Sequence, residues 1–449
     1  MSAPLSQSQQ LAARSLRSVW HPCTQMRRHE SEPPIAVARG HGPWLYDADG
    51  RRYFDAISSW WVNLFGHTNA RINRALVDQL ERLEHAMLAG FTHEPVVALS
   101  EQLAALTGHA LGRCFYASDG ASAVEIALKM SVHAWRNAGH AAKTEFICVA
   151  GAYHGETLGA LGVTDTALFR APYESMLRPA HIAASPDARR ALPGQSAAEV
   201  AVHALADMER LLQERRGHIA AVIVEPLVQC ASGMAMHDAA YVAGLRALCD
   251  AHGVHLIADE IAVGCGRSGS FFACEQARIW PDFLCLSKGI SGGYLPLSLV
   301  MAQEHIYQAF YDDDLRRGFL HSHSYTGNPL ACRAALETLA IFEDDDVLAR
   351  NRVFADAMTE ALQPLAHDPR VAHFRQTGMI WAWDTLLDGR PDAAGFSRRF
   401  YAEAARRELL LRPIGNTVYL MPPYILDAQD AAWLAERVRQ VFDVVMEAA

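Results

Sequence analysis

Long apolar runs are missing from this sequence of 449 residues. No stretch approaches the roughly 20 consecutive apolar residues that a membrane-spanning helix needs. The first 20 residues also lack the unbroken apolar segment of a secretory signal. We therefore expect a soluble, cytoplasmic protein with no membrane partner.

An excess of basic residues is missing as well. Lys and Arg number 40 against 50 Asp and Glu, so the formal net charge is -10. Because nucleic-acid binding needs a basic patch to neutralise phosphates, we expect no nucleic acid partner. The nine cysteines contain no CxxC pair, which argues against a disulfide framework and against a zinc site. Reduced cysteines fit the cytoplasm, and no metal is expected.

Short apolar stretches alternate with helical patterns along the middle of the chain. A helix is expected from about residue 71, with Ile72, Leu76, Leu80 and Leu83 on one face. Strands are then expected at 113–117, 146–150, 219–224, 255–258 and 283–286. This βα alternation predicts an α/β fold with a mostly parallel central sheet.

The two ends of the chain follow other patterns. Asp49-Gly50 between alternating residues predicts a β-hairpin over 43–55. A long helix is expected from about 329 to 341, and strands at 379–383 and 418–421. The expected division is residues 1–70 and 331–449 in a smaller α+β domain and residues 71–330 in the large domain. A mobile surface loop is expected at 188–196.

The stretch from His255 to Gly293 organises the chain. One apolar run ends in Asp259-Glu260, and a second ends in Ser287-Lys288-Gly289. Ligands of doubly wound sheets bind at the carboxyl ends of the strands, where a desolvated lysine amine becomes a nucleophile. Pyridoxal phosphate needs such a lysine and an acid that keeps its pyridine nitrogen protonated. Lys288 and Asp259 therefore predict this cofactor, against the alternative of a solvated lysine and a turn aspartate.

Two further strand ends carry candidate cofactor contacts. Ser118-Asp119-Gly120-Ala121-Ser122 opens a helix, whose N–H groups predict a phosphate site, or otherwise an ordinary helix cap. Tyr153, in Gly151-Ala152-Tyr153-His154-Gly155, either stacks on a pyridine ring or fills the core.

Four other features carry less specific signals. The GxGxxG pattern at 264–269 lacks the following helix and acid of a dinucleotide site, so we interpret it as a turn. His321 and His323 lack a third metal ligand of matching spacing, and the hydroxyls of that loop are alternatives for phosphate. Trp60 and Trp61 are interpreted as strand-like, with one packed in the core and the other facing a cleft. Arg412 ends an apolar run and is expected to be a semi-buried partner for a substrate carboxylate.

These residues resemble the class III aminotransferases, which are fold-type I pyridoxal-phosphate enzymes. The resemblance runs from the 43–55 hairpin through DEIAVGCGRSG and Lys288 to TGNPLAC. Within that family, WHPCTQM, SSWW and LLRPIGNTVYLMPPYI are similar to the branch that serves biotin biosynthesis.

The resemblance implies a role for each site residue. Lys288 would hold the cofactor as a Schiff base and shuttle a proton, and Asp259 would pair with the pyridinium nitrogen. Gly120 and Ala121 would bind the phosphate, with His323 and Ser324 added from the second subunit of a homodimer. Substrate contacts would come from Trp60, Trp61, Tyr153, Ser322 and Arg412.

The implied reaction is a ping-pong transamination. S-adenosylmethionine would donate an amino group, and 8-amino-7-oxononanoate would accept it to become 7,8-diaminononanoate. Cys23, Ala121 and Ser324 stand where the family pattern commonly has tyrosine, serine and threonine. Because Cys23 removes a phenol from the donor end, lysine remains an alternative donor. Rival interpretations are another class III ω-aminotransferase and a nicotinamide-dependent dehydrogenase built on Gly264.

Overall fold

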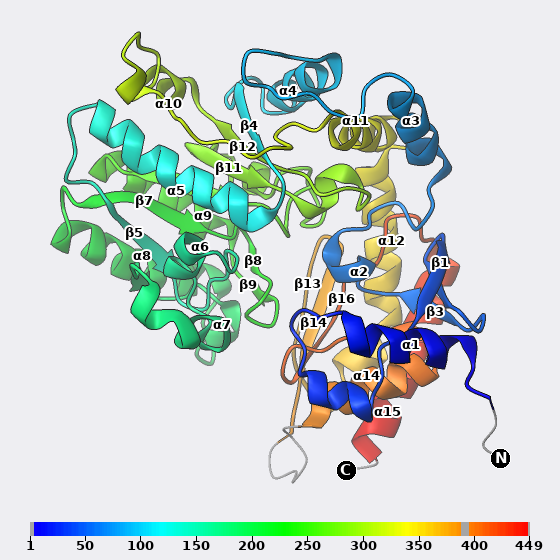
Figure 1. Cartoon of the computed structure of the whole chain (residues 1–449). Coiled ribbons are helices and arrows are strands. Elements are labelled where there is room, and N and C mark those ends of the chain that lie inside the picture. Colours follow the sequence, from blue (N-terminus) through cyan, green and yellow to red (C-terminus); the bar gives the residue numbers. More distant parts are fainter. Residues whose placement is uncertain (1–3, 388–394, 448–449) are drawn as a thin grey trace.

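Five strands that the sequence predicts, and two that it does not, form one seven-stranded sheet in the computed structural model of residues 4–387 and 395–447 (Figure 1). Its order is β4-β12-β11-β10-β7-β5-β6. The strands are β4 (Arg113–Ala117), β5 (Glu145–Val149), β6 (His181–Ala183), β7 (Ile219–Val224), β10 (His255–Asp259), β11 (Phe283–Leu286) and β12 (Ser298–Ala302). β12 runs antiparallel to both of its neighbours, β11 and β4, and the other strands all share one direction, so the expected mostly parallel sheet is confirmed.

Helices cover both faces of this sheet because its strands are apolar on both sides. Ile223 and Ile257 face a core shared with α5 (Gly120–Asn137). Val222 and Leu256, one residue away in each strand, pack against α8 (Ala197–Glu214) and α9 (Ala239–His252). Successive strand residues point to opposite faces, so uninterrupted apolar runs such as β7 are what a doubly covered parallel sheet requires.

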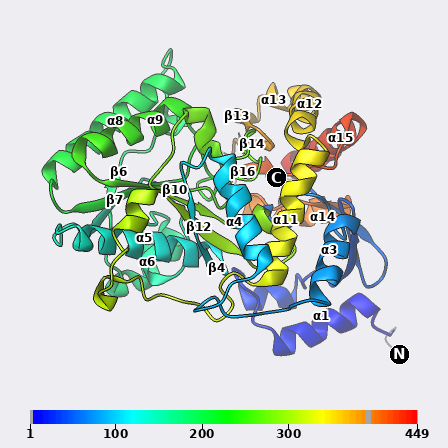
Figure 2. The ribbon, with the colours of Figure 1, turned by 90° about the horizontal axis from the view of Figure 1, so that it is seen from above.

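The remaining helices of this middle part are shorter or lie around the sheet (Figure 2). They are α3 (Ala70–Leu80), α4 (Glu94–Leu106), α6 (Leu158–Gly162), α7 (Ala167–Arg170), α10 (Glu304–Gln308) and α11 (Pro329–Asp344). The 3₁₀ turns are η1 (Met26–Glu30), η2 (Ala171–Met176), η3 (Ala188–Arg190), η4 (Ala273–Ala277), η5 (Lys288–Ser291) and η6 (Leu315–Arg317). Two short strands, β8 (Val228–Gln229) and β9 (Ala235–Met236), pair antiparallel to form a separate two-stranded sheet. None of the helices described is long and apolar enough to cross a membrane.

The N- and C-terminal segments meet in two smaller sheets. The first has the order β1-β2-β3-β15, with β1 (Val37–His41), β2 (Trp44–Asp47), β3 (Arg52–Asp55) and β15 (Leu409–Leu410). The second joins β13 (Val371–Thr377), β14 (Ile380–Thr385) and β16 (Thr417–Leu420). Around them lie α1 (Gln7–Ser18), α12 (Val347–Ala361), α13 (Gln363–Ala366), α14 (Phe396–Arg406) and α15 (Ala428–Glu447). The domain boundaries expected near 70 and 330 stay a prediction.

The predicted hairpin at 43–55 is confirmed, because β2 and β3 pair antiparallel around Asp49-Gly50. The helix expected from residue 71 is confirmed only in part. It ends at Leu80, whose side chain is exposed, and Leu83 lies beyond it. Ala75 and Gln79 are buried on the packed face instead.

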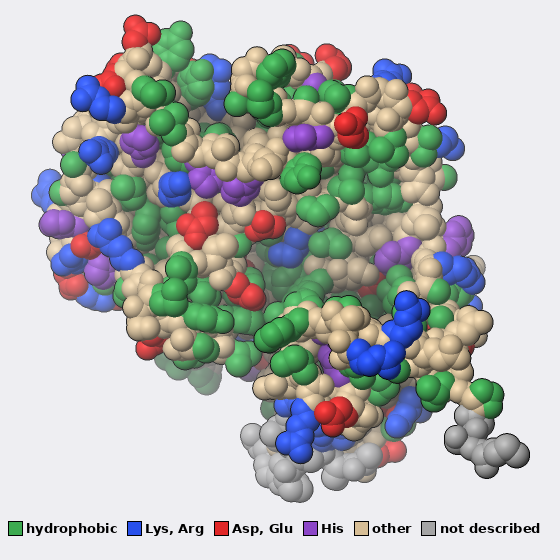
Figure 3. Space-filling view, viewed as in Figure 1, with side chains coloured by type: hydrophobic (Ala, Val, Ile, Leu, Met, Phe, Trp, Pro, Cys, Tyr) green, Lys and Arg blue, Asp and Glu red, His purple; other side chains and the backbone are tan. Residues whose placement is uncertain are grey.

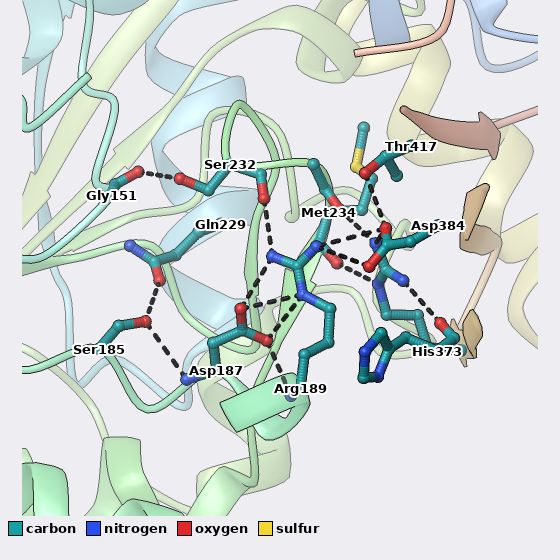
Figure 4. A network of polar contacts seen from close by, with 12 residues as sticks. Gly151, Ser185, Asp187, Arg189, Gln229, Ser232, Met234, His373, Asp384 and Thr417 are labelled. Carbon is teal, nitrogen blue, oxygen red and sulfur yellow. Dashed lines mark hydrogen bonds and ion pairs between the residues drawn. The ribbon is translucent and has the colours of Figure 1, made fainter. Parts of the chain in front are cut away.

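The expectation of a mobile surface loop at 188–196 is wrong for its first residues. Arg189 pairs with Asp187 at 2.8 Å, donates to the carbonyl of Ser232 at 2.9 Å, and reaches Asp384 of β14 at 3.3 Å (Figure 4). Burial alone would raise the pKa of Asp384, but the arginines and a hydrogen bond from Thr417 bring it below its usual range. This ionic cluster ties the middle of the chain to the C-terminal strands.

The strand-like interpretation of Ser58–Trp61 is also wrong. These four residues form α2, a helical turn in which every φ is positive: 49, 46, 72 and 72°. Left-handed backbone costs about 1–2 kcal/mol per non-glycine residue, or roughly 4–8 kcal/mol for the four. One indole is nonetheless buried and the other exposed, as expected, since the exposed fraction is 6% for Trp61 and 47% for Trp60.

Candidate active site

Lys288 is the first residue of η5 and is separated from the end of β11 by Ser287 alone. Its backbone has a φ of 47°, and its Nζ lies 5.3 Å from the centre of the Trp61 ring. Burial lowers the pKa of this amine, although Asp259, Cys230 and Glu225 partly oppose the effect. No hydrogen-bond partner for Nζ exists in the described part of the chain. The structure therefore holds a desolvated amine that is available for reaction.

Asp259 ends β10, the strand beside β11, and is 4% exposed. Its Oδ2 lies 2.7 Å from Nδ1 of His154, and its Oδ1 accepts the N–H of Ile261 at 3.1 Å. A carboxylate only accepts hydrogen bonds, so Nδ1 of His154 donates. The predicted strand-end placement of Asp259 and Lys288 is confirmed.

Glu225 is a buried acid that the sequence reasoning missed. It follows β7, the other neighbour of β10, and accepts the N–H groups of Tyr153 and Cys230. Desolvation raises its pKa to about 7, with His154 lowering it and Asp259 raising it. Glu225 carries the same signal as Asp259, an acid directly after an apolar strand, and that signal was sufficient to find it.

The start of α5 offers a cradle for an anion. Asp119 caps the helix by accepting the N–H of Ser122, and no acceptor for the N–H groups of Gly120 or Ala121 exists among the residues described. Such free donors and the helix dipole favour a phosphate. Gly155 packs directly on this turn, since a Cβ there would lie 2.5 Å from Cβ of Ala121.

Tyr153 lies at the edge of this region. Its hydroxyl donates to Glu156 at 2.9 Å, and its ring packs against Phe169 with centres 5.3 Å apart. Burial, together with the charge of Glu156, raises the pKa of its phenol. Glu156 also acts electrostatically on Cys23, which brings the N-terminal segment to the same edge.

Trp60 and Arg412 lie together on the surface, where the guanidinium carbon is 5.4 Å from the centre of the indole. Nη2 of Arg412 donates to the carbonyl of Cys23 at 3.2 Å. Arg412 is exposed, so its expected semi-burial is wrong, because β15 ends two residues earlier and the chain turns outward. The molecular face in Figure 3 is hollowed near its middle, with a basic side chain deep in the hollow.

The loop containing His321, Ser322, His323 and Ser324 lies elsewhere. His321 contacts Lys129 at 2.8 Å and Nε2 of His323 at 3.2 Å, while the two serines are exposed. None of the contacts of this loop in the described structure goes to the strand ends that hold Lys288 and Asp259. The described residues also contain no group of three or more His, Cys, Asp or Glu side chains arranged for a metal.

The GxGxxG segment forms a turn after β10, as interpreted from the sequence. Arg267 within it is 1% exposed, lies 4.7 Å from the centre of the Tyr424 ring, and donates to the carbonyl of Pro422. The buried Arg267 fills this turn, so the turn offers no open helix N-terminus at which the pyrophosphate of a dinucleotide could bind.

The strand-end residues fit pyridoxal phosphate. An unpartnered amine, a buried acid on the adjacent strand and two free helix N–H groups match its aldehyde, pyridine nitrogen and phosphate. The family model of class-III aminotransferases matches residues 25–442. The chain belongs to the class III aminotransferase family. It is therefore a pyridoxal-phosphate-dependent aminotransferase that acts on small molecules.

Relatives within the family are similar over almost the whole chain. The adenosylmethionine-8-amino-7-oxononanoate aminotransferase of Helicobacter pylori is 42% identical, covering 96% of this chain and 98% of the relative. The enzyme of the same name from Synechococcus elongatus is 40% identical, with 95% and 99% covered.

Solved structures show the same fold. The Methanocaldococcus jannaschii enzyme of that name has a TM-score of 0.90 at 30% identity, covering 97% of this chain and 98% of its own. A PLP-bound amine transaminase from an uncultivated Pseudomonas species also scores 0.90, at 31% identity, with 95% and 99% covered. The fold class expected from the sequence is confirmed.

Proposed function

We propose that this protein transfers an amino group from S-adenosylmethionine to 8-amino-7-oxononanoate, giving 7,8-diaminononanoate in two half-reactions at one site. The observation that carries transamination is the desolvated amine of Lys288 beside the buried acid Asp259. The substrates are supported by full-length relatives named for them.

When bound, pyridoxal phosphate supplies an aldehyde that takes up amino groups and a ring that withdraws electrons. Lys288 provides the nucleophilic amine, which burial keeps uncharged more readily than an exposed lysine. The same amine then moves a proton at the substrate carbon. Asp259 holds a proton at the pyridine nitrogen, and His154 fixes the orientation of that carboxylate. The N–H groups of Gly120 and Ala121 anchor the phosphate.

Substrate binding is assigned to the exposed edge of the site. The guanidinium of Arg412 pairs with the carboxylate of the keto acid, for which its planar fork is suited. Trp60, Trp61 and Tyr153 supply aromatic walls that suit both a cationic donor and an aliphatic chain. Ser322, which lies on the same loop as His323 and Ser324, would contact substrate through its backbone at the site of the neighbouring subunit.

A homodimer is part of the proposal, with His323 and Ser324 completing the phosphate site of the neighbouring subunit. Their placement away from Lys288 within one chain supports this arrangement. The nine cysteines are all free, which supports a reducing compartment such as the cytoplasm.

The test is turnover by the purified holoenzyme with 8-amino-7-oxononanoate and one donor at a time. S-adenosylmethionine should yield 7,8-diaminononanoate, and should by itself convert the visible band of the lysine-bound cofactor to that of the aminated cofactor. If only lysine converted the cofactor band, the amino donor would be lysine, and the assignment of 8-amino-7-oxononanoate as acceptor would stay the same. Activity only between an ω-amino compound and 2-oxoglutarate would replace the proposal with the general ω-aminotransferase.

A further inference from the structure

The left-handed turn at Ser58–Trp61 places two aromatic side chains beside two different basic side chains. The ring of Trp61 lies 5.3 Å from Nζ of Lys288, and the ring of Trp60 lies 5.4 Å from the guanidinium carbon of Arg412. The two tryptophans are consecutive, so the backbone between them fixes both contacts at once. A change of handedness in this turn would redirect at least one of the indoles.

The outer and the middle residues of the turn are held by different partners. Of the two buried outer residues, Ser58 donates to the carbonyl of Met421 at 2.8 Å, and Nε1 of Trp61 donates to the hydroxyl of Tyr419 at 3.2 Å. These contacts secure Trp61 to the β16 region. They do not reach Ser59 or Trp60.

Asp55 holds the middle of the turn. Its Oδ1 accepts the N–H of Ser59 at 2.8 Å, and its Oδ2 accepts the hydroxyl of Ser59 at 2.6 Å. Nε2 of His67 contacts the same Oδ2 at 3.0 Å. Asp55 is 1% exposed and ends β3, so a buried carboxylate joins the sheet to a residue with a φ of 46°.

We propose that Asp55 is a positioning residue that keeps the middle of the turn, Ser59 and Trp60, left-handed. It thereby sets the aromatic wall beside Arg412 and the specificity for the carboxylate-bearing substrate. This inference rests on the proposed function to the extent that Arg412 binds that carboxylate. Because Trp61 has its own partners, loss of Asp55 acts more strongly on substrate binding at Arg412 than on the cofactor at Lys288.

Ser59 allows a test without a buried charge. Ser59→Gly and Ser59→Val both remove the hydroxyl, but glycine accepts positive φ at no steric cost, whereas a β-branched residue resists it. We expect the glycine variant to keep KM for the keto acid within about threefold of wild type, whereas the valine variant raises it at least about tenfold. The KM for the amino donor and the dissociation constant of the cofactor should both change by smaller factors than the KM for the keto acid.

Asp55→Asn tests the carboxylate itself. Losing charge-assisted hydrogen bonds should raise KM for the keto acid roughly tenfold to a hundredfold, and Asp55→Asn/Ser59→Gly should recover most of that loss. Asp47→Asn is the matched control, since Asp47 also accepts a tyrosine hydroxyl and turn N–H groups in the same sheet but has no contact with the tryptophan turn. Equal effects of Asp47→Asn and Asp55→Asn, or of the two Ser59 variants, would overturn the proposal.

A fluorescence measurement tests the positioning of Trp60 independently of which substrate the enzyme uses. Trp20 and Trp60 are the strongly exposed tryptophans of the described chain, so a Trp20→Phe background leaves Trp60 as the main indole open to acrylamide. Quenching of the holoenzyme should change for Ser59→Val and stay unchanged for Ser59→Gly. If quenching behaves as expected but no variant alters KM for 8-amino-7-oxononanoate, the substrate assignment fails and the positioning of Trp60 stands. Unchanged quenching in both variants would refute the positioning itself.

Discussion

His154 and Asp259 form a hydrogen-bonded pair closed to solvent, with 2.7 Å between Nδ1 and Oδ2. The pair joins the loop after β5 to the end of β10. Asp259 is thus held by a ring as well as by its own strand, which fixes the direction in which its second oxygen points.

Replacing His154 should weaken cofactor binding. His154→Leu removes the donor to Asp259 and should raise the dissociation constant of pyridoxal phosphate roughly tenfold to a hundredfold, since a hydrogen bond to a charged group contributes about 1.5–3 kcal/mol. His154→Asn retains an N–H donor and should lose less. Titration of the apoprotein with the cofactor measures both, and His181→Leu, which removes the His181–Glu145 contact between β6 and β5, is the control. Equal affinities for the leucine and asparagine variants would contradict the role of the donor.

Lys288→Met should abolish turnover without unfolding the protein. Because burial lowers the pKa of Lys288 below 10.5, the unfolded chain binds this proton more tightly than the folded one. The lysine therefore costs stability at low and neutral pH, and the cost disappears as the pH rises toward 10.5. Denaturant unfolding of the two apoproteins should show the methionine variant as the more stable at pH 7, with the difference narrowing by pH 10. If the free energies of unfolding of the two apoproteins had the same pH dependence, this would contradict a desolvated amine at Lys288.

Two buried glutamates should make the apoprotein less stable as the pH rises from about 4.5 to 7. Desolvation raises the pKa of both Glu225 and Glu260 to about 7, so the folded state holds protons that the unfolded state has released. Each glutamine variant should remove up to about 3 kcal/mol of this decline.

The two glutamates serve as controls for each other. Glu260 accepts N–H groups of Ala273 and Cys274 in η4, whereas the charge of Glu225 raises the pKa of Lys288. Glu225→Gln should therefore also alter the pH profile of kcat, while Glu260→Gln should not. If both variants shift the activity profile alike, Glu225 has no special relation to the reacting amine.

Arg412→Ala should raise KM for 8-amino-7-oxononanoate about tenfold to a hundredfold, with a much smaller effect on the donor, because a charge-assisted partner of the carboxylate is lost. Arg412→Lys keeps the charge without the planar fork and should be intermediate. Steady-state kinetics of each substrate measures the difference, with Arg398→Ala on α14 as an exposed control. Equal losses for donor and acceptor would reassign Arg412.

Regular periodicity explains what the sequence predicts well. Fully buried parallel strands leave continuous apolar runs, so β7, β10 and β11 and the acid and lysine at their ends are visible without a structure. β6 has three residues, and β12 is an antiparallel strand between parallel neighbours, so neither follows the repeated βα unit that directed the prediction.

The tryptophan turn shows why the rest could not be predicted. Ser-Ser-Trp-Trp contains no glycine, and nothing in its composition indicates left-handed backbone. Ser58 contacts Met421, 363 residues away, and Ser59 contacts Asp55 at the buried end of β3, and the four residues of the turn by themselves indicate neither contact. The ionic cluster around Arg189 was missed for the same reason, since its partner Asp384 lies far along the chain.

The pairing of β3 with β15 sets an order in which the protein can be made. Phe54 pairs with Leu409, and Arg51 donates to the carbonyl of Ala405, 354 residues further along. During synthesis the edge of the N-terminal hairpin therefore stays unpaired until the residues of β15 have been made. Such distant contacts form slowly, and unpaired edges invite wrong association. The wall of the site that carries the two tryptophans is thus completed only after β15 and the residues around Tyr419 and Met421 have been made.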